Sequence, residues 1–189
     1  MANITGTNRN NVLRGTKRSD VIKGLGGNDR LTGLNGNDAL YGDNGKDSLY
    51  GGNNNDRLFG GLGNDVLNGG NDNDRLFGGD DNDRLFGGSG NDVIAGGSGN
   101  DTLIGGRGND RLRGGSGKDT FRLASGDGTD IIVDFRERFD RIDLVGLSSS
   151  DLDFVASGNN TLLKVIATGE VLAQLNNVSV TDLDSSNFF

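Results

Sequence analysis

The chain has 189 residues and a net charge of −8, a size that suits one domain or one domain with a small appendage. It contains no Cys, His, Pro or Trp, which excludes disulfides, thiol nucleophiles, Ser-His-Asp triads and histidine metal ligands. The acidic balance argues against nucleic acid and anionic membranes as partners, and no apolar run is long enough to span a bilayer. Residues 1–10 lack the apolar segment that a cleavable signal peptide requires.

Glycine and aspartate dominate the composition and recur with a fixed period. Gly accounts for 35 residues, and the 27 acidic residues include only two Glu, Glu137 and Glu170. Gly recurs every nine residues from Gly6 to Gly114, which gives 13 units of nine residues over residues 6–122 without an insertion. Such a strict period is the signature of a repeat architecture.

We number each unit from one to nine, starting at that Gly. Position six is Asp in 12 of the 13 units, and position eight is always large and apolar. Position four is mostly Gly, and in three further units it is Asn or Asp, which tolerate a left-handed backbone. The pattern predicts a tight turn over positions one to six and a very short strand over positions seven to nine. Only position eight would face inward, because strand side chains alternate.

One apolar residue in nine gives a thin core, so the fold needs another source of stability. The position-six carboxylates would repel one another in stacked turns without a counter-ion. A hard divalent cation would bind Asp oxygens and turn carbonyls together. Low-complexity disorder and a metal-free solenoid are the two competing interpretations, and neither explains the regular Asp.

The repeat resembles the RTX family of calcium-binding nonapeptide repeat proteins, whose pattern is G-G-x-G-x-D-x-U-x. The best copies are residues 60–68, 87–95, 96–104 and 105–113, and 11 consecutive units cover residues 24–122. The resemblance implies an all-β fold. It is a right-handed parallel β-roll with two nonapeptides per turn and a small C-terminal β cap, in which units n and n+2 stack.

The resemblance also implies the calcium ligands. In the family, each Ca²⁺ lies between two stacked turns and takes an Asp and backbone carbonyls from both. In this chain Asp65 would pair with Asp83, and the 11 units would give about nine ions. The other expected pairs include Asp92 with Asp110 and Asp101 with Asp119. The implied carboxylate ligands are Asp29, Asp38, Asp47, Asp56, Asp65, Asp74, Asp83, Asp92, Asp101, Asp110, Asp119 and Asp130. The implied carbonyl ligands include Gly61, Gly63, Gly88, Gly90, Gly97, Gly99, Gly106, Gly108, Gly115 and Gly117.

The first two units depart from the pattern, because Arg9 and Arg18 occupy position four. We expect residues 1–23 to form a metal-poor capping turn in which these cations stand in for metal, since terminal repeats are usually atypical. Residues 24–133 would form the calcium-binding roll. Three extra carboxylates near the middle units either strengthen binding or lie in solvent: Asp72, Asp80 and Asp81.

The tail continues the roll and then changes character. After residue 122 the phase slips by two residues, and residues 125–133 fit the pattern again with Asp130 at position six. Residues 134–189 contain few glycines, and we expect them to form the cap. The strands expected there are Arg141–Val145, 153–156, 161–167 and Val171–Leu175, the last two joined as a hairpin.

The end of the chain, DLDSSNFF, resembles the uncleaved signal that type I secretion systems recognise. The alternative is a cap strand in which Phe188 and Phe189 only pack on the roll. Export would place the protein outside the cell or at its surface. There millimolar Ca²⁺ would fold a chain that stays disordered in the low-calcium cytosol.

Of the possible functions, the resemblance favours a secreted calcium-binding protein with a structural or matrix role. We expect no enzyme, because residues 134–189 carry no nucleophile–base set, and no ice-binding surface, because position three lacks a row of Thr. The alternative is an accessory module that binds a glycan or cell-surface partner through outward side chains. These are Tyr41, Arg57, Phe59, Arg75 and Phe77, although β-propensity and the covering of a flat face would also explain them.

Overall fold

The computed structural model describes residues 1–189 as 19 strands and three short 3-10 turns. The strands of the repeat are β1 (Asn3–Thr5), β2 (Val12–Arg14), β3 (Val21–Gly26), β4 (Arg30–Asn35), β5 (Ala39–Asn44), β6 (Ser48–Asn53), β7 (Arg57–Leu62), β8 (Val66–Asn71), β9 (Arg75–Asp80), β10 (Arg84–Ser89), β11 (Val93–Ser98), β12 (Thr102–Arg107), β13 (Arg111–Ser116), β14 (Thr120–Ala124) and β15 (Asp130–Ile132). The cap contains β16 (Arg141–Val145), η1 (Ser149–Asp151), β17 (Leu152–Ser157), β18 (Asn160–Val165), β19 (Val171–Leu175), η2 (Val180–Asp182) and η3 (Ser185–Asn187). None of these helices is long and apolar enough to cross a membrane.

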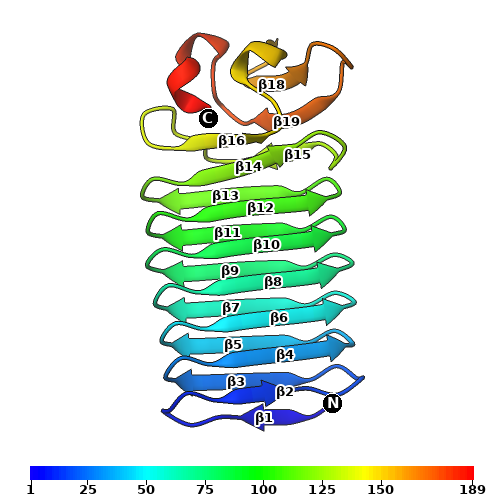
Figure 1. The fold of residues 1–189 in the computed structure, drawn as a ribbon, viewed down its shortest axis with the longest axis vertical. Coiled ribbons are helices and arrows are strands. Elements are labelled where there is room, and N and C mark those ends of the chain that lie inside the picture. Colours follow the sequence, from blue (N-terminus) through cyan, green and yellow to red (C-terminus); the bar gives the residue numbers. More distant parts are fainter.

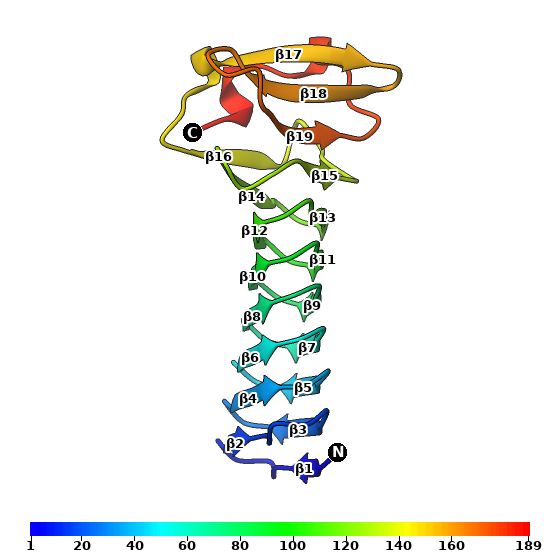
Figure 2. The ribbon, with the colours of Figure 1, turned by 90° about the vertical axis from the view of Figure 1, so that its right-hand side faces the viewer.

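The repeat strands alternate between two parallel sheets. The odd-numbered strands from β1 to β15 form one sheet, and the even-numbered strands from β2 to β16 form the other. From β1 to β14 the register pairs each residue with the one 18 positions later, as in Arg57 with Arg75, and the spacing rises to 20 at β15 and 21 at β16. Figure 1 shows the turns stacked along one axis, and Figure 2 shows the two layers edge-on beneath a wider cap. The predicted parallel β-roll with two nonapeptides per turn is confirmed.

The predicted lengths of the strand and the turn are wrong. Strands β3 to β13 are six residues long and run from position seven to position three of the next unit, so the turn is only positions four to six. Side chains alternate along such a strand, and both position eight and position one are buried, as Leu58 and Gly60 are in β7. A Cβ on Gly60 would overlap the Asp65 carboxylate. Position one therefore lies within a strand, and its glycine leaves room for the buried carboxylate at position six of the same unit.

The core is a single layer of position-eight side chains between the two sheets. Twelve of them, from Ile22 to Phe121, are fully buried. The same cluster continues into the cap through residues such as Ile132, Ile142 and Leu163. Each turn is thus stabilised by its neighbours above and below, as expected of a quasi-one-dimensional fold.

The cap closes the upper end of both sheets. β16 extends the even sheet beside β14, and β19 pairs in parallel with β15. The hairpin of β18 and β19 is confirmed, and β17 adds to it in antiparallel fashion. Phe188 is buried and bridges Ile142, whereas Phe189 is exposed. The chain end therefore packs on the cap, and this packing leaves the export hypothesis untested.

Candidate metal centre

The position-six aspartates form two rows, one along each edge of the roll. In both rows the backbone N–H of one Asp donates to Oδ1 of the Asp in the next turn, at 2.8 Å between Asp65 and Asp83. One row contains Asp20, Asp38, Asp56, Asp74, Asp92, Asp110 and Asp130. The other contains Asp29, Asp47, Asp65, Asp83, Asp101, Asp119 and Asp140. The predicted stacking of units n and n+2 is confirmed, including the pairs Asp92–Asp110 and Asp101–Asp119.

The second carboxylate oxygen in these rows has no partner in most turns. Oδ2 is buried without a hydrogen bond in ten residues: Asp29, Asp38, Asp47, Asp56, Asp65, Asp74, Asp83, Asp92, Asp101 and Asp110. In the same ten turns the position-four carbonyl, such as that of Gly45 or Gly63, also accepts no hydrogen bond from the protein. Buried polar groups are normally paired, so each of these turns presents oxygens that need a positive partner.

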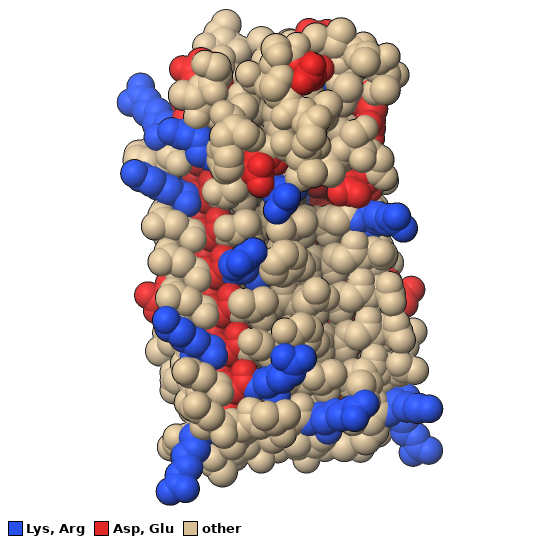
Figure 3. All heavy atoms as spheres, viewed as in Figure 1, with Lys and Arg blue, Asp and Glu red and all other residues tan.

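The electrostatics of the rows indicate the same need. Desolvation, reinforced by neighbouring carboxylates, raises the pKa of Asp74 and Asp83 to about 8 and that of Asp56 and Asp65 to about 7. The rows are flanked by cationic side chains on the surface. Figure 3 shows a line of acidic atoms running up one edge of the roll, with separate Lys and Arg side chains beside it.

The donor set fits calcium. All the free groups are oxygens, and Ca²⁺ takes six to eight oxygen ligands that include carboxylates and backbone carbonyls. No group of three or more Asp or Glu side chains is placed to hold one metal ion, so each ion would take much of its coordination from the backbone. The ten glycines predicted as carbonyl ligands all have positive φ, for example 116° at Gly61 and 111° at Gly63. They therefore hold the left-handed backbone that favours glycine.

The backbone torsion at position two decides whether the N–H of that residue reaches the position-six side chain of the same unit. From Leu25 onward in the repeat, φ at position two is positive. In these units the backbone N–H at position two does not donate to the position-six carboxylate. Thr7 and Thr16 lack this positive φ. Their N–H groups donate to the side chains of Asn11 and Asp20, both at 2.7 Å. In the first two units, the side-chain oxygen at position six thus accepts a hydrogen bond from the protein itself.

At the N-terminal end of the roll, hydrogen bonds to Asp20 lower the pKa of its carboxyl group. Desolvation raises the pKa of the Asp20 carboxyl, but hydrogen bonds from Thr16 and Ala2 outweigh it and bring the pKa below its usual value. The expectation that Arg9 and Arg18 stand in for metal is wrong. Both are exposed and neither forms an ion pair, because backbone donors already satisfy the turn.

The extra carboxylates Asp72, Asp80 and Asp81 are exposed. Asp72 accepts a hydrogen bond from the Asn54 N–H at 3.1 Å. The charges of Asp72 and Asp81 contribute to the raised pKa of Asp74 and Asp83, after desolvation. Asp72 and Asp81 therefore add negative potential to the rows from the solvent side.

The structure adds two sets of residues that the sequence analysis missed. Asp140 continues one row, but it lies 21 residues after Asp119 and so falls outside the nonapeptide phase. Position-five Asn side chains form a second ladder, in which Oδ1 of Asn73 accepts the Asn91 N–H at 2.6 Å. The recurrence of Asn at position five was the available signal for this ladder.

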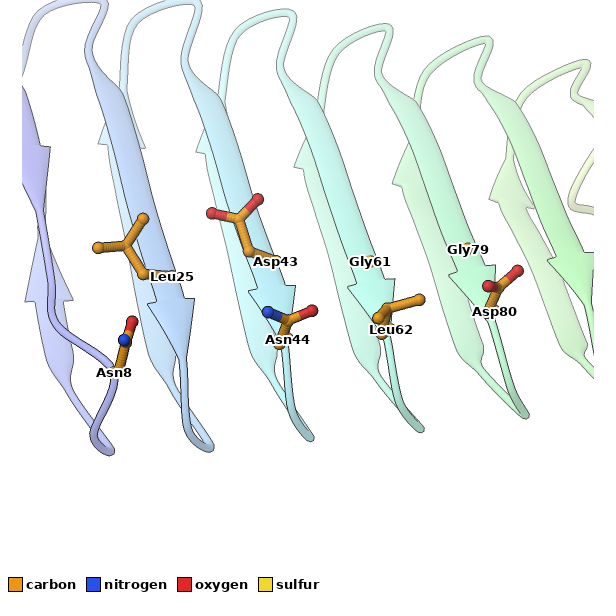
Figure 4. Close-up of a pocket in the computed structure, with 8 residues that line it drawn as sticks. All are labelled: Asn8, Leu25, Asp43, Asn44, Gly61, Leu62, Gly79 and Asp80. Atoms are coloured by element: carbon orange, nitrogen blue, oxygen red, sulfur yellow. The ribbon is translucent and has the colours of Figure 1, made fainter.

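The predicted outward face also forms. Tyr41, Phe59 and Phe77 stack in one column with ring centroids 4.9 and 5.1 Å apart, and Arg57 pairs in register with Arg75. Two residues further along the same strands lies a shallow trough of about 550 Å³. Figure 4 shows that Gly61 and Gly79 leave its floor bare between Leu25, Asp43, Leu62 and Asp80.

The repeat matches the model of a known protein family. The model of the RTX calcium-binding nonapeptide repeat (4 copies) matches residues 5–40, 32–67, 59–94, 68–103 and 95–132. No curated protein matches the chain.

Two solved structures share the fold. The AlgE6R3 subunit of a mannuronan C5-epimerase from Azotobacter vinelandii is 29% identical, with a TM-score of 0.51 over 64% of this chain and 78% of that one. The extracellular lipase LipA from Serratia marcescens is 18% identical, with a TM-score of 0.50 over 92% of this chain. The chain spans only 38% of the lipase, so this second likeness concerns the fold alone.

Proposed function

The chain belongs to the RTX calcium-binding nonapeptide repeat family, and from that premise we propose that it is a secreted protein whose roll folds on binding Ca²⁺. Its role is structural, in the matrix outside the cell or at the cell surface, and it has no catalytic activity. The orphaned Oδ2 atoms of the two Asp rows are the observation that carries this proposal.

Ten stacked pairs would hold the ions. Each begins at an Asp with an orphaned oxygen and ends at the next Asp of its row, from Asp29–Asp47 to Asp110–Asp130. The position-four carbonyl of the first turn supplies a further free oxygen. This number exceeds the expected nine by the Asp110–Asp130 pair. When bound, Ca²⁺ supplies the positive charge that cancels the repulsion between neighbouring carboxylates.

Binding of this kind couples folding to calcium. Ions that bind only the folded chain stabilise it by mass action, and a tenfold excess over Kd contributes roughly 1.4 kcal/mol per site. Ten such sites contribute on the order of 14 kcal/mol, which is comparable with the whole net stability of a typical domain. At millimolar calcium, extracellular sites with Kd near ~10⁻⁴ M reach this excess.

Export by a type I apparatus completes the proposal, and the resemblance of the chain end to such a signal supports it. In the folded protein this end is engaged, because the Phe189 N–H donates to the Ile142 carbonyl and its own carbonyl accepts the Leu144 N–H. The signal would therefore be recognised while the chain is unfolded in low calcium.

Circular dichroism of chelator-stripped protein, titrated with Ca²⁺ and followed by ion counting, tests the proposal. We expect a transition from coil to β structure and about ten bound ions. Asp83→Asn should lower the count by up to two, because Asp83 belongs to two stacked pairs. The exposed Asp80→Asn is the matched control and should leave the count unchanged. A fully folded chain in excess chelator would refute calcium-gated folding.

A second candidate function is the binding of an acidic glycan at the end of the aromatic column. The stacked rings cover one another's faces, but the column stops at Phe77 because the next residue in register is Ala95. A hollow of about 360 Å³ opens there, lined by Phe77, Ala95, Arg111 and Arg113 among others. A sugar ring could stack on the free face of Phe77 with its carboxylate near Arg111, since Arg113 already pairs with Asp134 at 3.4 Å.

Mannuronan oligomers, suggested by the epimerase subunit, are the probe for this second function. Ala95→Phe fills the hollow and should abolish binding, whereas Ala39→Phe, a substitution outside the hollow, should not. Equal binding by wild-type protein and Ala95→Phe, with both variants folded in calcium, rejects the glycan site.

A further inference from the structure

Arg136 inserts its guanidinium between the last two carboxylates of one Asp row. Its Nη2 donates to the Gly117 carbonyl at 2.7 Å, to Asp119 Oδ2 at 3.3 Å and to Asp140 Oδ1 at 3.0 Å. Asp119 and Asp140 are almost fully buried, while the Arg136 side chain is about one-third exposed. The guanidinium thus reaches the buried pair from the solvent side.

Two of the three acceptors of that nitrogen correspond to groups left free in the turns below. Gly117 is at position four, and its carbonyl corresponds to the unbonded carbonyls of Gly99 and Gly108. Asp119 Oδ2 corresponds to the orphaned Oδ2 of Asp101, one turn earlier in the same row. The positive charge of Arg136 therefore occupies the position where each lower turn lacks one.

The backbone of Arg136 also matches the turns at the opposite end of the roll. Arg136 has no positive φ, and its N–H donates to Asp140 Oδ2 at 2.8 Å, as Thr16 does to Asp20. Nε donates to the same oxygen at 3.3 Å. Both oxygens of Asp140 are thus satisfied by protein groups.

The other row ends differently. Asp130 Oδ1 accepts the Asp110 N–H at 3.0 Å, but Asp110 Oδ2 is orphaned and no Lys or Arg forms an ion pair with either residue. The chain therefore contains two terminal Asp pairs of the same stacking geometry, one with a built-in cation and one without.

We propose that Arg136 is a tethered replacement for the calcium ion at the Asp119–Asp140 pair, so that this turn closes without metal. The inference rests on the proposed calcium function. It predicts that the two rows, although alike in sequence, end with different metal requirements. The junction of roll and cap then needs no calcium ion of its own in this row.

Ion counting by native mass spectrometry in saturating Ca²⁺ tests this with matched variants of the two terminal pairs. Asp130→Asn should bind one ion fewer than wild type, and Asp140→Asn should bind the same number. A loss of one ion in Asp140→Asn overturns the arginine assignment while leaving the calcium function intact. Absence of bound calcium in the wild-type protein instead overturns the calcium function, and the arginine assignment falls with it.

Removal of the guanidinium provides the second test. Arg136→Met should bind one ion more than wild type and should need a higher Ca²⁺ concentration for the coil-to-β transition, because the Asp119–Asp140 repulsion is no longer cancelled by a built-in cation. Arg138→Met, in the same turn but without an ion pair, should change neither quantity. An unchanged ion count and an unchanged calcium midpoint of the transition in Arg136→Met contradict the proposal. If Arg136→Met does not fold, the comparison of Asp130→Asn with Asp140→Asn still decides.

Discussion

At the scale of single residues, one backbone torsion at position two decides whether a carboxylate needs a cation. With φ in the ordinary region, as at Thr16, the local N–H donates to the position-six side chain. With positive φ, as at Gly61, that N–H is turned away and the Oδ2 of Asp65 is left free. Glycine is the natural residue for the second state.

Leu34 occupies this left-handed state with φ of 90°, a conformation that costs a non-glycine residue about 1–2 kcal/mol. Leu34→Gly should therefore raise the free energy of unfolding by about 1 kcal/mol, measured by denaturant titration in saturating calcium. Thr32→Gly, in the same strand without positive φ, should lower it by a similar amount. A destabilised Leu34→Gly would show that packing of the leucine outweighs the relief of strain.

The position-six Asp residues of the repeat could be predicted from the sequence, because they recur every nine residues. Asp140 and Arg136 could not, because the tail changes the spacing to 21 residues and only the fold reveals which side chains continue the row. Arg9 and Arg18 show the opposite case. A cation was expected at the N-terminal end, but the Thr7 and Thr16 N–H groups already provide the donors.

At the scale of elements, the six-residue strand is the unit of stability. A Gly-rich segment is typical of a turn, so the sequence alone predicts that positions one to three belong to the turn. In the roll the first Gly faces inward beside a carboxylate and the second carries positive φ within the ladder. Parallel pairing at five of the six strand residues, with neighbours on both sides, compensates for the single apolar side chain that each strand buries.

Because each strand contributes one core side chain, truncating that side chain should be costly. Leu67 in β8 is fully buried, and Leu67→Ala should lower the free energy of unfolding by about 3 kcal/mol, measured by chemical denaturation in calcium. Leu62→Ala is the control, since Leu62 is 51% exposed, and it should change stability little. Equal effects of the two substitutions would contradict the single-layer core.

At the scale of the whole molecule, the two Asp rows make the roll a proton-sensitive structure when calcium is absent. Burial raises the pKa of these carboxyls to about 6 at Asp92 and Asp101 and to about 8 at Asp74 and Asp83, from 3.8. The folded chain thus binds protons more tightly than the unfolded chain. This contribution to stability is complete below the unfolded pKa and is lost as pH rises through about 6 to 8.

Circular dichroism in chelator across this pH range should therefore show more β structure at pH 5 than at pH 8. In calcium the same acidification should release ions, because protons compete for the carboxylates. A chelator-treated chain whose β content rises with pH would contradict the assignment of these buried carboxyls.

The 18-residue register also sets how the molecule can change in length. Removing two adjacent units takes out one complete turn and leaves every later residue in its original sheet, row and column. Removing a single unit would transfer every later strand to the opposite sheet. If that unit lay between Phe59 and Phe77, it would separate these two rings, which now stack. Viable length variants of this roll should therefore differ by whole turns, and its ion capacity should change in steps of two, one for each row.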